Sequence, residues 1–277
     1  MDLYIKKDLD REDQIKDTIF YVPLAGSSSI SNFRSPDSYV FIFFEKSKGV
    51  HSVDFVEYKE TDNQIHISFP GQIHSWTTES SIGHKLIVSK EFIETYLFET
   101  AFSSRHINTN PVINITTEQA LYLRREFLLF KEEVENAKVS SRIIKLRGQL
   151  IINHIYEMMQ DHVLEEASKN GKPEIISKFD QLIEDYFLEA KTVKFYADRL
   201  AVTPNYLNIL TKKETGRTAK EVIDARVVLE AKRRLLGSRE SIKNIAFDLG
   251  FDSIPTFSNY IYRNTGCYPS KFRDTIL

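Results

Sequence analysis

The chain has 277 residues, 42% of them apolar and 27% charged, so it is long enough for two domains and can bury a core. Its single cysteine, Cys267, excludes an intrachain disulfide framework and a CxxC zinc site, as is typical of a reducing cytoplasm. The N-terminus has no signal-peptide apolar segment, and the longest apolar run, Tyr39 to Phe44, is too short for a membrane span. We therefore expect a cytoplasmic protein without membrane contact.

The net charge of −2 is unevenly distributed. Residues 1–173 hold 20 Lys and Arg against 25 Asp and Glu, whereas residues 191–277 hold 16 against 9, a net of +7. A basic terminal block on an otherwise acidic chain is typical of a protein that binds a polyanion. Basic surfaces are also often merely solvated, so charge alone leaves both interpretations open.

The first 115 residues have the pattern of short β-strands separated by turns. Runs rich in aromatic and β-branched residues cover 38–49, 50–59, 64–71 and 83–89, with Gly49, Asn63 and Pro70-Gly71 between them. Several short strands spaced by turns predict a small barrel or sandwich. A short helix is expected over residues 91–100.

After residue 116 the periodicity becomes helical. Two helices are predicted, from an N-cap at Thr117 to about Glu135 and from Ser140 to Ser168, and together they form an antiparallel hairpin. Their apolar stripes either cover the β-domain or provide a dimer surface, and both uses are compatible with the pattern. The stripes consist of Leu123, Phe127, Phe130 and Val134 in the first helix, and of Ile143, Leu146, Leu150, Ile151, Ile155, Met158 and Met159 in the second.

The polar segment at residues 169–174, which contains Gly171 and Pro173, has the composition of a linker. We therefore expect an α+β protein with a β regulatory domain at 1–115, a helical dimerisation or relay segment at 116–168, and an all-α domain at 175–277.

About seven helices are predicted in the last domain. Thr192, Thr203 and Ser241 are good N-caps, and Gly216, Gly237, Gly250 and Gly266 mark helix ends. Two segments repeat one design: a helix with a small central residue (Ala197 or Ala246), a tight turn, and a second helix. A small residue allows the close, steep crossing of a helix-turn-helix unit. The long helix between the units would set their spacing, which must be about 34 Å if both second helices enter successive major grooves.

The sequences YLNILTKKETGRTAKEVIDARVVLEAKRRLL and IKNIAFDLGFDSIPTFSNYIYRNTGCYPSKFR, in this order, resemble the AraC/XylS family of transcription regulators. The resemblance covers residues 175–277. The segment FPGQIHSW more weakly resembles the cupin-like effector domain that these regulators often carry, so the β-domain is expected to be a cupin-like barrel. Thr211 departs from the family pattern, which has a large apolar residue there, and Pro255 is tolerable only in the first turn of its helix.

The resemblance implies that the second helix of each unit faces base edges. It places Asn205, Asn208, Ile209, Ile254, Pro255, Thr256 and Asn259 against the bases. The residues expected at phosphates are Tyr206, Lys212, Lys213, Arg217, Arg263 and Lys271. Asn suits bidentate pairing with adenine, and Ile and Thr methyls suit thymine, so an A·T-biased site is expected, with more specificity in the first unit.

The β-domain is expected to sense a small molecule. The aromatic-rich candidates for a pocket are Phe33, Phe41, Phe43, Phe55, His74 and Trp76, although these residues would serve equally well in an ordinary core. His51, His66, His74 and His84 lack the spacing of a cupin metal site, and no nucleophile elbow, zincin motif or P-loop is present, so no metal, cofactor or enzyme activity is expected.

The resemblance implies a homodimeric activator that binds promoter DNA and contacts RNA polymerase. The alternative is a cupin-type small-molecule-binding protein whose helical domain docks a protein partner.

Overall fold

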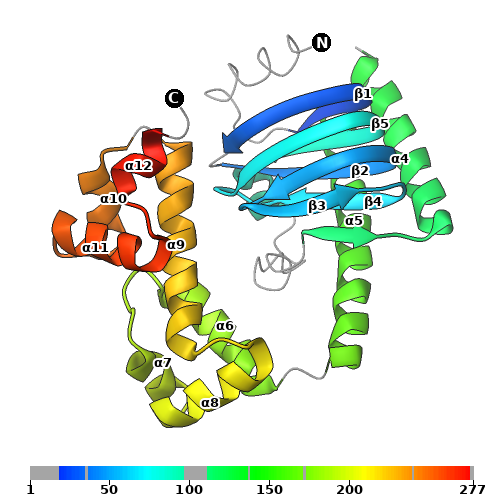
Figure 1. Ribbon diagram of the computed structural model, residues 1–277. Coiled ribbons are helices and arrows are strands. Elements are labelled where there is room, and N and C mark those ends of the chain that lie inside the picture. Colours follow the sequence, from blue (N-terminus) through cyan, green and yellow to red (C-terminus); the bar gives the residue numbers. More distant parts are fainter. Residues whose placement is uncertain are drawn as a thin grey trace. The chain divides into compact units, whose positions relative to one another are not determined.

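The computed structural model describes residues 19–34, 37–96, 111–136, 138–170, 173–238 and 240–274 (Figure 1). The chain divides into two compact units, residues 1–166 and 167–277. Among the described residues, no helix combines the length and the apolar character needed to cross a membrane.

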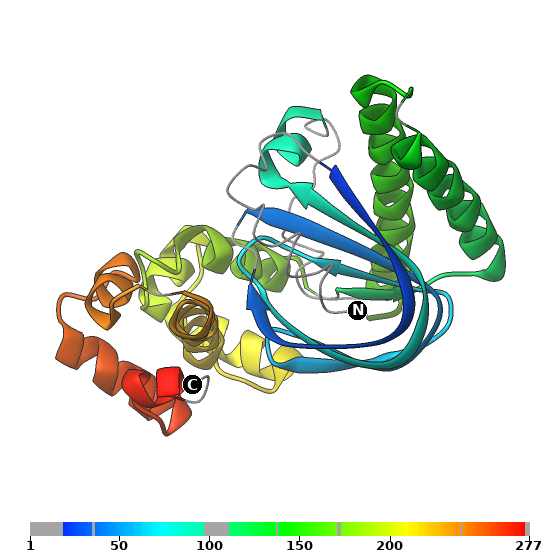
Figure 2. The ribbon, with the colours of Figure 1, turned by 90° about the horizontal axis from the view of Figure 1, so that it is seen from above.

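The first unit is built on a six-stranded antiparallel sheet of order β1-β5-β2-β4-β6, with β3 paired to β2. Its strands are β1 (Ile19–Arg34), β2 (Ser38–Val53), β3 (Val56–Glu60), β4 (Gln64–Ser68), β5 (Ile73–Ser89) and β6 (Val112–Asn114). The long strands are strongly bent (Figure 2). Within the described part of the chain, the pairing runs from β1 to β6 and does not return to β1. The expected antiparallel domain is present, and closure into a cupin barrel stays a prediction.

The strands differ from the sequence prediction mainly at β1 and β2. β1 was not predicted, because Pro23, Gly26 and the serines after it have the composition of a loop. Among the described strands it pairs with β5 alone, an edge position in which proline is tolerated, and its register shifts between Gly26 and Ser28 and again between Ile30 and Phe33. β2 joins two expected strands into one that pairs with β5 along its length and with β4 and then β3 on its other edge.

The two faces of the sheet have different partners. Phe41 and Phe43 are fully buried in a core shared with the helices α4 (Thr117–Glu135) and α5 (Ser141–Asn170). Val40, Ile42 and Phe44 alternate with them and form a smaller apolar cluster with Leu24 and Ile87 on the opposite face. Both views show α4 and α5 lying along one side of the sheet (Figures 1 and 2).

The helical hairpin is present, with one correction. Thr116, not Thr117, is the N-cap of α4, because the Thr116 side chain and Gln119 form a reciprocal capping box. Leu123, Phe127 and Phe130 of the predicted stripe are fully buried, but Val134 is 41% exposed. Arg147 of α5 holds the pair together by bonding to Glu126 and Glu133 of α4.

The remaining boundaries of the first unit differ slightly from expectation. The helix expected at 91–100 is α2 (Lys90–Tyr96), and residues 97–100 lie outside the described residues. α5 continues to Asn170, into the segment expected to be a linker, of which Gly171 and Lys172 are not described.

The second unit is helical throughout its described elements. They are α6 (Glu174–Tyr186), α7 (Val193–Arg199), α8 (Pro204–Thr215), α9 (Ala219–Gly237), α10 (Ile242–Asp248), α11 (Ile254–Thr265) and α12 (Pro269–Asp274). One apolar core, to which all these helices contribute, includes α9 residues Ile223, Val227 and Ala231. α9 is therefore the central element on which the pairs α7–α8 and α10–α11 are assembled (Figure 1).

The two pairs are constructed alike. Ala197 and Ala246 are both fully buried, as a close helix crossing requires. Thr203 and Ser253 accept hydrogen bonds from the backbone N–H groups of Tyr206 and Thr256 and so cap α8 and α11. Both helices end in a left-handed glycine, Gly216 at φ 74° and Gly266 at φ 72°. The Thr residues before these glycines repeat the same side-chain bonds to the preceding turn, from Thr215 to the carbonyl of Thr211 and from Thr265 to that of Ile261.

Candidate nucleic-acid interface and N-terminal cavity

The exposed face of α8 carries the first set of side chains expected to contact DNA. Asn205, Tyr206 and Ile209 are exposed, Ile209 at 61%, while Leu207 is fully buried in the core. An apolar side chain as exposed as Ile209 at the centre of a capped helix suits a surface that is covered in a complex.

Asn208 is placed differently from its neighbours. It is only half-buried, and its Oδ1 accepts a hydrogen bond of 3.1 Å from the backbone N–H of Ala219, the first residue of α9. Asn208, which is expected to contact a base, therefore also links α8 to α9.

α11 presents the second predicted set on one exposed surface. Ile254, Pro255, Thr256 and Asn259 are all exposed, and Pro255 lies in the first turn, where a missing N–H is tolerated. The hydroxyl of Thr256 lies 2.8 Å from that of Ser253, so its methyl group is the less engaged half of the side chain.

Two groups of basic residues in this unit have different surroundings. Lys212, Lys213, Arg217, Arg263 and Lys271 are exposed near the ends of α8 and α11 and in α12. By contrast, Arg226, Arg233 and Arg234 on α9 are paired with the carboxylate of Glu230. Part of the positive charge counted in the sequence is therefore used in ion pairs inside the domain, whereas the first group is exposed.

Glu230 is the centre of the internal ion network. Its burial alone would raise its pKa, but the three arginines outweigh burial and hold the pKa below its ordinary value. Arg226 also bonds to Glu184 of α6, and Arg234 to Asp248 of α10. The network thus links α9 to α6 and to α10.

Thr211, which departs from the family pattern, is nevertheless buried at 1% exposure. Its hydroxyl donates to the carbonyl of Leu207 at 2.7 Å, so the polar atom is satisfied within α8.

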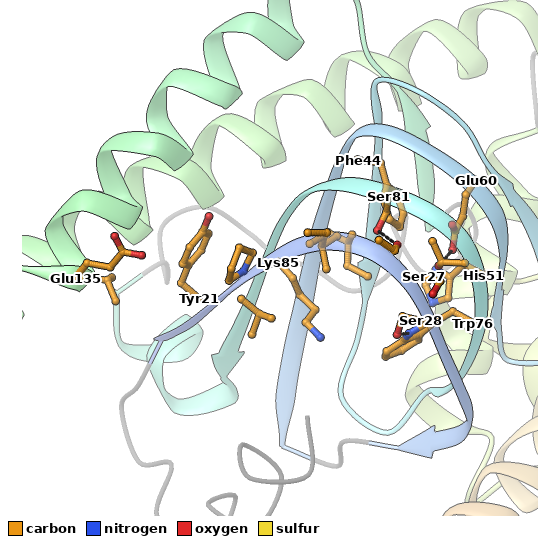
Figure 3. Close-up of a pocket in the computed structure, with 18 residues that line it drawn as sticks. Tyr21, Ser27, Ser28, Phe44, His51, Glu60, Trp76, Ser81, Lys85 and Glu135 are labelled. Carbon is orange, nitrogen blue, oxygen red and sulfur yellow. Dashed lines mark hydrogen bonds between the residues drawn. The ribbon is translucent and has the colours of Figure 1, made fainter. Parts of the chain in front are cut away.

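The first unit contains a cavity of about 500 Å³ on the face of the sheet opposite the Phe41 core. Figure 3 shows His51, Glu60, Trp76 and Ser28 grouped at one end, with Tyr21 and Glu135 at the other. Its walls are mainly apolar and include Val22, Pro23, Leu24, Ile42 and Phe44.

Of the six residues predicted to line a pocket, Trp76 alone lines this cavity. Phe41 and Phe43 point to the helices, because side chains alternate along β2, so they have the role in an ordinary core that the sequence left open as the alternative. His74 is buried beside the cavity, and Phe33 of β1 is paired with His74 of β5. Phe55 is 42% exposed in the turn between β2 and β3.

Three buried histidines form a hydrogen-bonded chain next to Trp76. The Nδ1 atoms of His51 and His66 lie 2.8 Å apart, and Nε2 of His51 lies 3.4 Å from Nδ1 of His74. Gln64 Oε1 accepts from the backbone N–H of Thr61 and lies 3.1 Å from His66 Nε2, so this nitrogen must carry the proton. His66 Nδ1 is then an acceptor, and His51 donates to it from Nδ1.

Burial favours the neutral forms of His51 and His66. Desolvation, and then the neighbouring His74, lower the pKa of His51 to about 3, and desolvation followed by His51 lowers the pKa of His66 well below its ordinary value. Among the described residues, no group of His, Cys, Asp and Glu is arranged to hold a metal ion.

Glu60, Lys85 and the β1 residues of the cavity were not predicted. Glu60 is a buried carboxylate whose oxygens accept from Ser47 and Thr78, and Gly49 beside it has no room for a side chain. The run of aromatic and β-branched residues from Ile19 to Val22 was a signal for β1, although Pro23 and the serine run obscured it.

Comparison with known proteins identifies a domain within the second unit. Residues 196–275 match a family model described as a helix-turn-helix domain. The chain is 24% identical to the uncharacterised HTH-type transcriptional regulator YobQ of Bacillus subtilis over 46% of its length, and 32% identical to the HTH-type transcriptional activator RhaS of Escherichia fergusonii over 33%. These matches span 47% of YobQ and 33% of RhaS, so the chain matches less than half of each relative.

A similar solved structure is the C-terminal domain of AraT, a response regulator from Geobacillus stearothermophilus. The match covers 38% of this chain and 87% of the AraT domain, with 26% identity and a TM-score of 0.35. Taken with the paired, capped helices described above, the family match shows that residues 196–275 are a helix-turn-helix domain.

Proposed function

We propose that this protein is a sequence-specific, DNA-binding transcription regulator. The observation that carries the proposal is the repetition of one capped recognition helix, α8 and α11, each packed on α9 and each with an exposed reading face beside exposed cations. Two such helices on one rigid element can enter successive major grooves. Side chains on the reading faces contact bases, and the flanking cations contact phosphates.

Selection of binding sites from random DNA tests this function. The full chain is expected to enrich one bipartite, A·T-biased site, with its two halves about one helical turn apart. An enriched site without a bipartite pattern, or salt-insensitive binding, would argue against it. Failure to bind any DNA while capturing a protein partner would favour the alternative, a small-molecule-binding protein with a helical docking domain.

The cavity of the first unit supports control by a small molecule. It combines apolar walls with the buried polar groups of His51 and Glu60 and the half-buried Trp76 at one end, which is the usual character of a ligand site. Because Trp76 is the only tryptophan, its fluorescence reports on the cavity directly. A ligand found by thermal-shift screening should change Trp76 emission in the native protein and lose affinity in Glu60→Gln. A ligand that binds Glu60→Gln equally well would lie elsewhere.

Dimerisation is proposed through the helical hairpin. Ile143, Leu146 and Leu150 of the predicted α5 stripe remain 45%, 52% and 39% exposed, although Ile151 and Ile155 are fully buried in the core. Exposed apolar residues on one helix suit a surface covered by a second copy. Leu146→Glu should convert a dimer to a monomer in analytical ultracentrifugation, whereas Leu121→Glu, on α4, serves as a control for added charge. A wild-type monomer at micromolar concentration would contradict this role.

Activation of transcription at a promoter, contact with RNA polymerase and a cytoplasmic location complete the proposal. The relative named as an activator, RhaS, supports the sign of regulation. In a purified transcription assay on a promoter that carries the selected site, the protein should raise transcript yield, and a decrease would make it a repressor.

A further inference from the structure

The side-chain amide of Asn208 has a fixed orientation. The atom that faces Ala219 lies 3.1 Å from a backbone N–H, which can only donate. That atom must therefore be the Oδ1 oxygen, and the NH2 group is the half of the amide left for another partner. Asn208 is half-buried on α8, between the exposed Asn205 and Ile209.

The second helix-turn-helix unit supplies an internal comparison. Ser258 occupies the position in α11 that Asn208 occupies in α8, since each lies five residues after its N-cap. Pro269 begins α12 as Ala219 begins α9, each three residues after the left-handed glycine. Proline has no N–H, so the second unit has no donor that an asparagine would need to satisfy. The asparagine thus occurs in the unit that has this N–H group.

This pairing constrains how α8 can read DNA. Bidentate recognition of adenine needs an amide that accepts from N6 and donates to N7 at the same time. The Oδ1 of Asn208 already accepts from Ala219, so the NH2 group is the half of the amide that has no partner among the described residues. Asn205 is exposed and has no such tie among the described residues, so it keeps both halves of its amide.

We propose that Asn208 reads its base pair as a hydrogen-bond donor only, through an acceptor such as a purine N7, guanine O6 or thymine O4. Cytosine, which presents a donor in the major groove, is excluded at the contacted position. The inference rests on the proposed DNA binding and revises the expectation that Asn208 pairs with adenine through two bonds.

The test uses the full chain and its selected site. Each purine is replaced in turn by its 7-deaza analogue, which lacks the N7 acceptor, and each adenine by purine, which lacks the N6 donor. Each thymine is replaced by 5-methylpyrimidin-2-one, which lacks O4. The base contacted by Asn208 is identified with Asn208→Asp, which keeps an oxygen for Ala219 but removes the NH2 donor. Asn205→Asp is the matched control in the same helix.

At the base identified by Asn208→Asp, loss of an acceptor should weaken wild-type binding about fivefold, the effect of one hydrogen bond. Loss of N6, if that base is adenine, should change affinity less than twofold. Equal losses from both analogues would show bidentate pairing, and an unchanged analogue profile in Asn208→Asp would show that Asn208 contacts no base. Either result overturns the proposal.

Stability provides the second readout. Asn208→Asp should keep the thermal midpoint of the wild type, because a carboxylate also accepts from Ala219 and is favoured at a helix N-terminus. Asn208→Ala should lower the midpoint. If Asn208→Asp loses as much as Asn208→Ala, the oxygen does not hold α9 and the inference fails. Failure of the wild type to select any site would instead concern the proposed function.

Discussion

Two glycines with the same backbone conformation differ in the space around them, so the same substitution should affect stability differently. Gly250 and Gly266 have almost the same left-handed conformation, at φ 73° and 72°. A Cβ on Gly250 would lie 2.2 Å from the carbonyl oxygen of Leu188, whereas a Cβ on Gly266 would meet nothing within 4 Å. The two glycines thus separate backbone strain from steric exclusion.

Gly266→Ala should cost about 1–2 kcal/mol of unfolding free energy, the cost of an L-residue in the left-handed region. Gly250→Ala should cost more, about 3 kcal/mol or above, because the helices around Leu188 must also move. Urea denaturation of the two variants measures the difference. Equal losses would mean that the backbone near Leu188 moves aside easily.

The histidine chain gives the first unit a pH-dependent stability. The folded pKa of His51, about 3, lies below the ordinary value of 6.5, so the unfolded chain binds the proton first. Stability is therefore complete above about pH 6.5 and declines as the pH falls toward 3, by about 1.4 kcal/mol per pH unit for each such histidine. Trp76-detected denaturation between pH 7 and 5 should show this slope, and His51→Gln should reduce it. A slope that His51→Gln leaves unchanged would assign it to other groups.

Exposed residues were easier to predict than buried polar ones. Asn205, Ile209 and Asn259 were expected to be exposed on recognition helices, and they are, since helix periodicity and caps set the exposed face. The chain of His51, His66 and His74 and the buried Glu60 depend on which strands pair, which local patterns do not encode. The Asn208 contact likewise joins two helices across 11 positions.

At the scale of elements, the helices of the second unit were predicted well because caps and glycines mark their ends. The sheet was predicted less well. β1 contains Pro23, Gly26 and a serine run, and the middle of β5 is polar, so both resemble loops in sequence although they pair along most of their length. These two strands form much of the cavity, which explains why its lining was largely missed.

The ends of α8 and α11 should supply most of the salt-sensitive binding. Lys212, Arg217 and Arg263 are exposed, and each is expected to neutralise one phosphate. Replacing any one by alanine should reduce the slope of log affinity against log salt by about 0.9. Lys178 of α6, exposed and paired with Glu174, is the control and should leave the slope unchanged. Variants that weaken binding without changing the slope would show that these side chains do not contact phosphates.

At the scale of the whole molecule, the two units have separate apolar cores. One core contains the sheet, α4 and α5 residues, the other contains α6 to α12, and no described buried residue belongs to both. Separate cores predict separate unfolding transitions. Trp76 reports on the first unit alone, while helical circular dichroism reports on both.

DNA should therefore stabilise the two units unequally. Binding at about 100 times the dissociation constant adds about 2.7 kcal/mol to the unit that binds. We expect the selected site to raise the circular-dichroism midpoint of the second unit and to leave the Trp76 midpoint nearly unchanged. A ligand of the cavity should do the reverse. Any shift of the Trp76 midpoint by DNA measures the coupling between the units, because linkage is reciprocal. Equal shifts at both probes would show that the chain unfolds as one cooperative body.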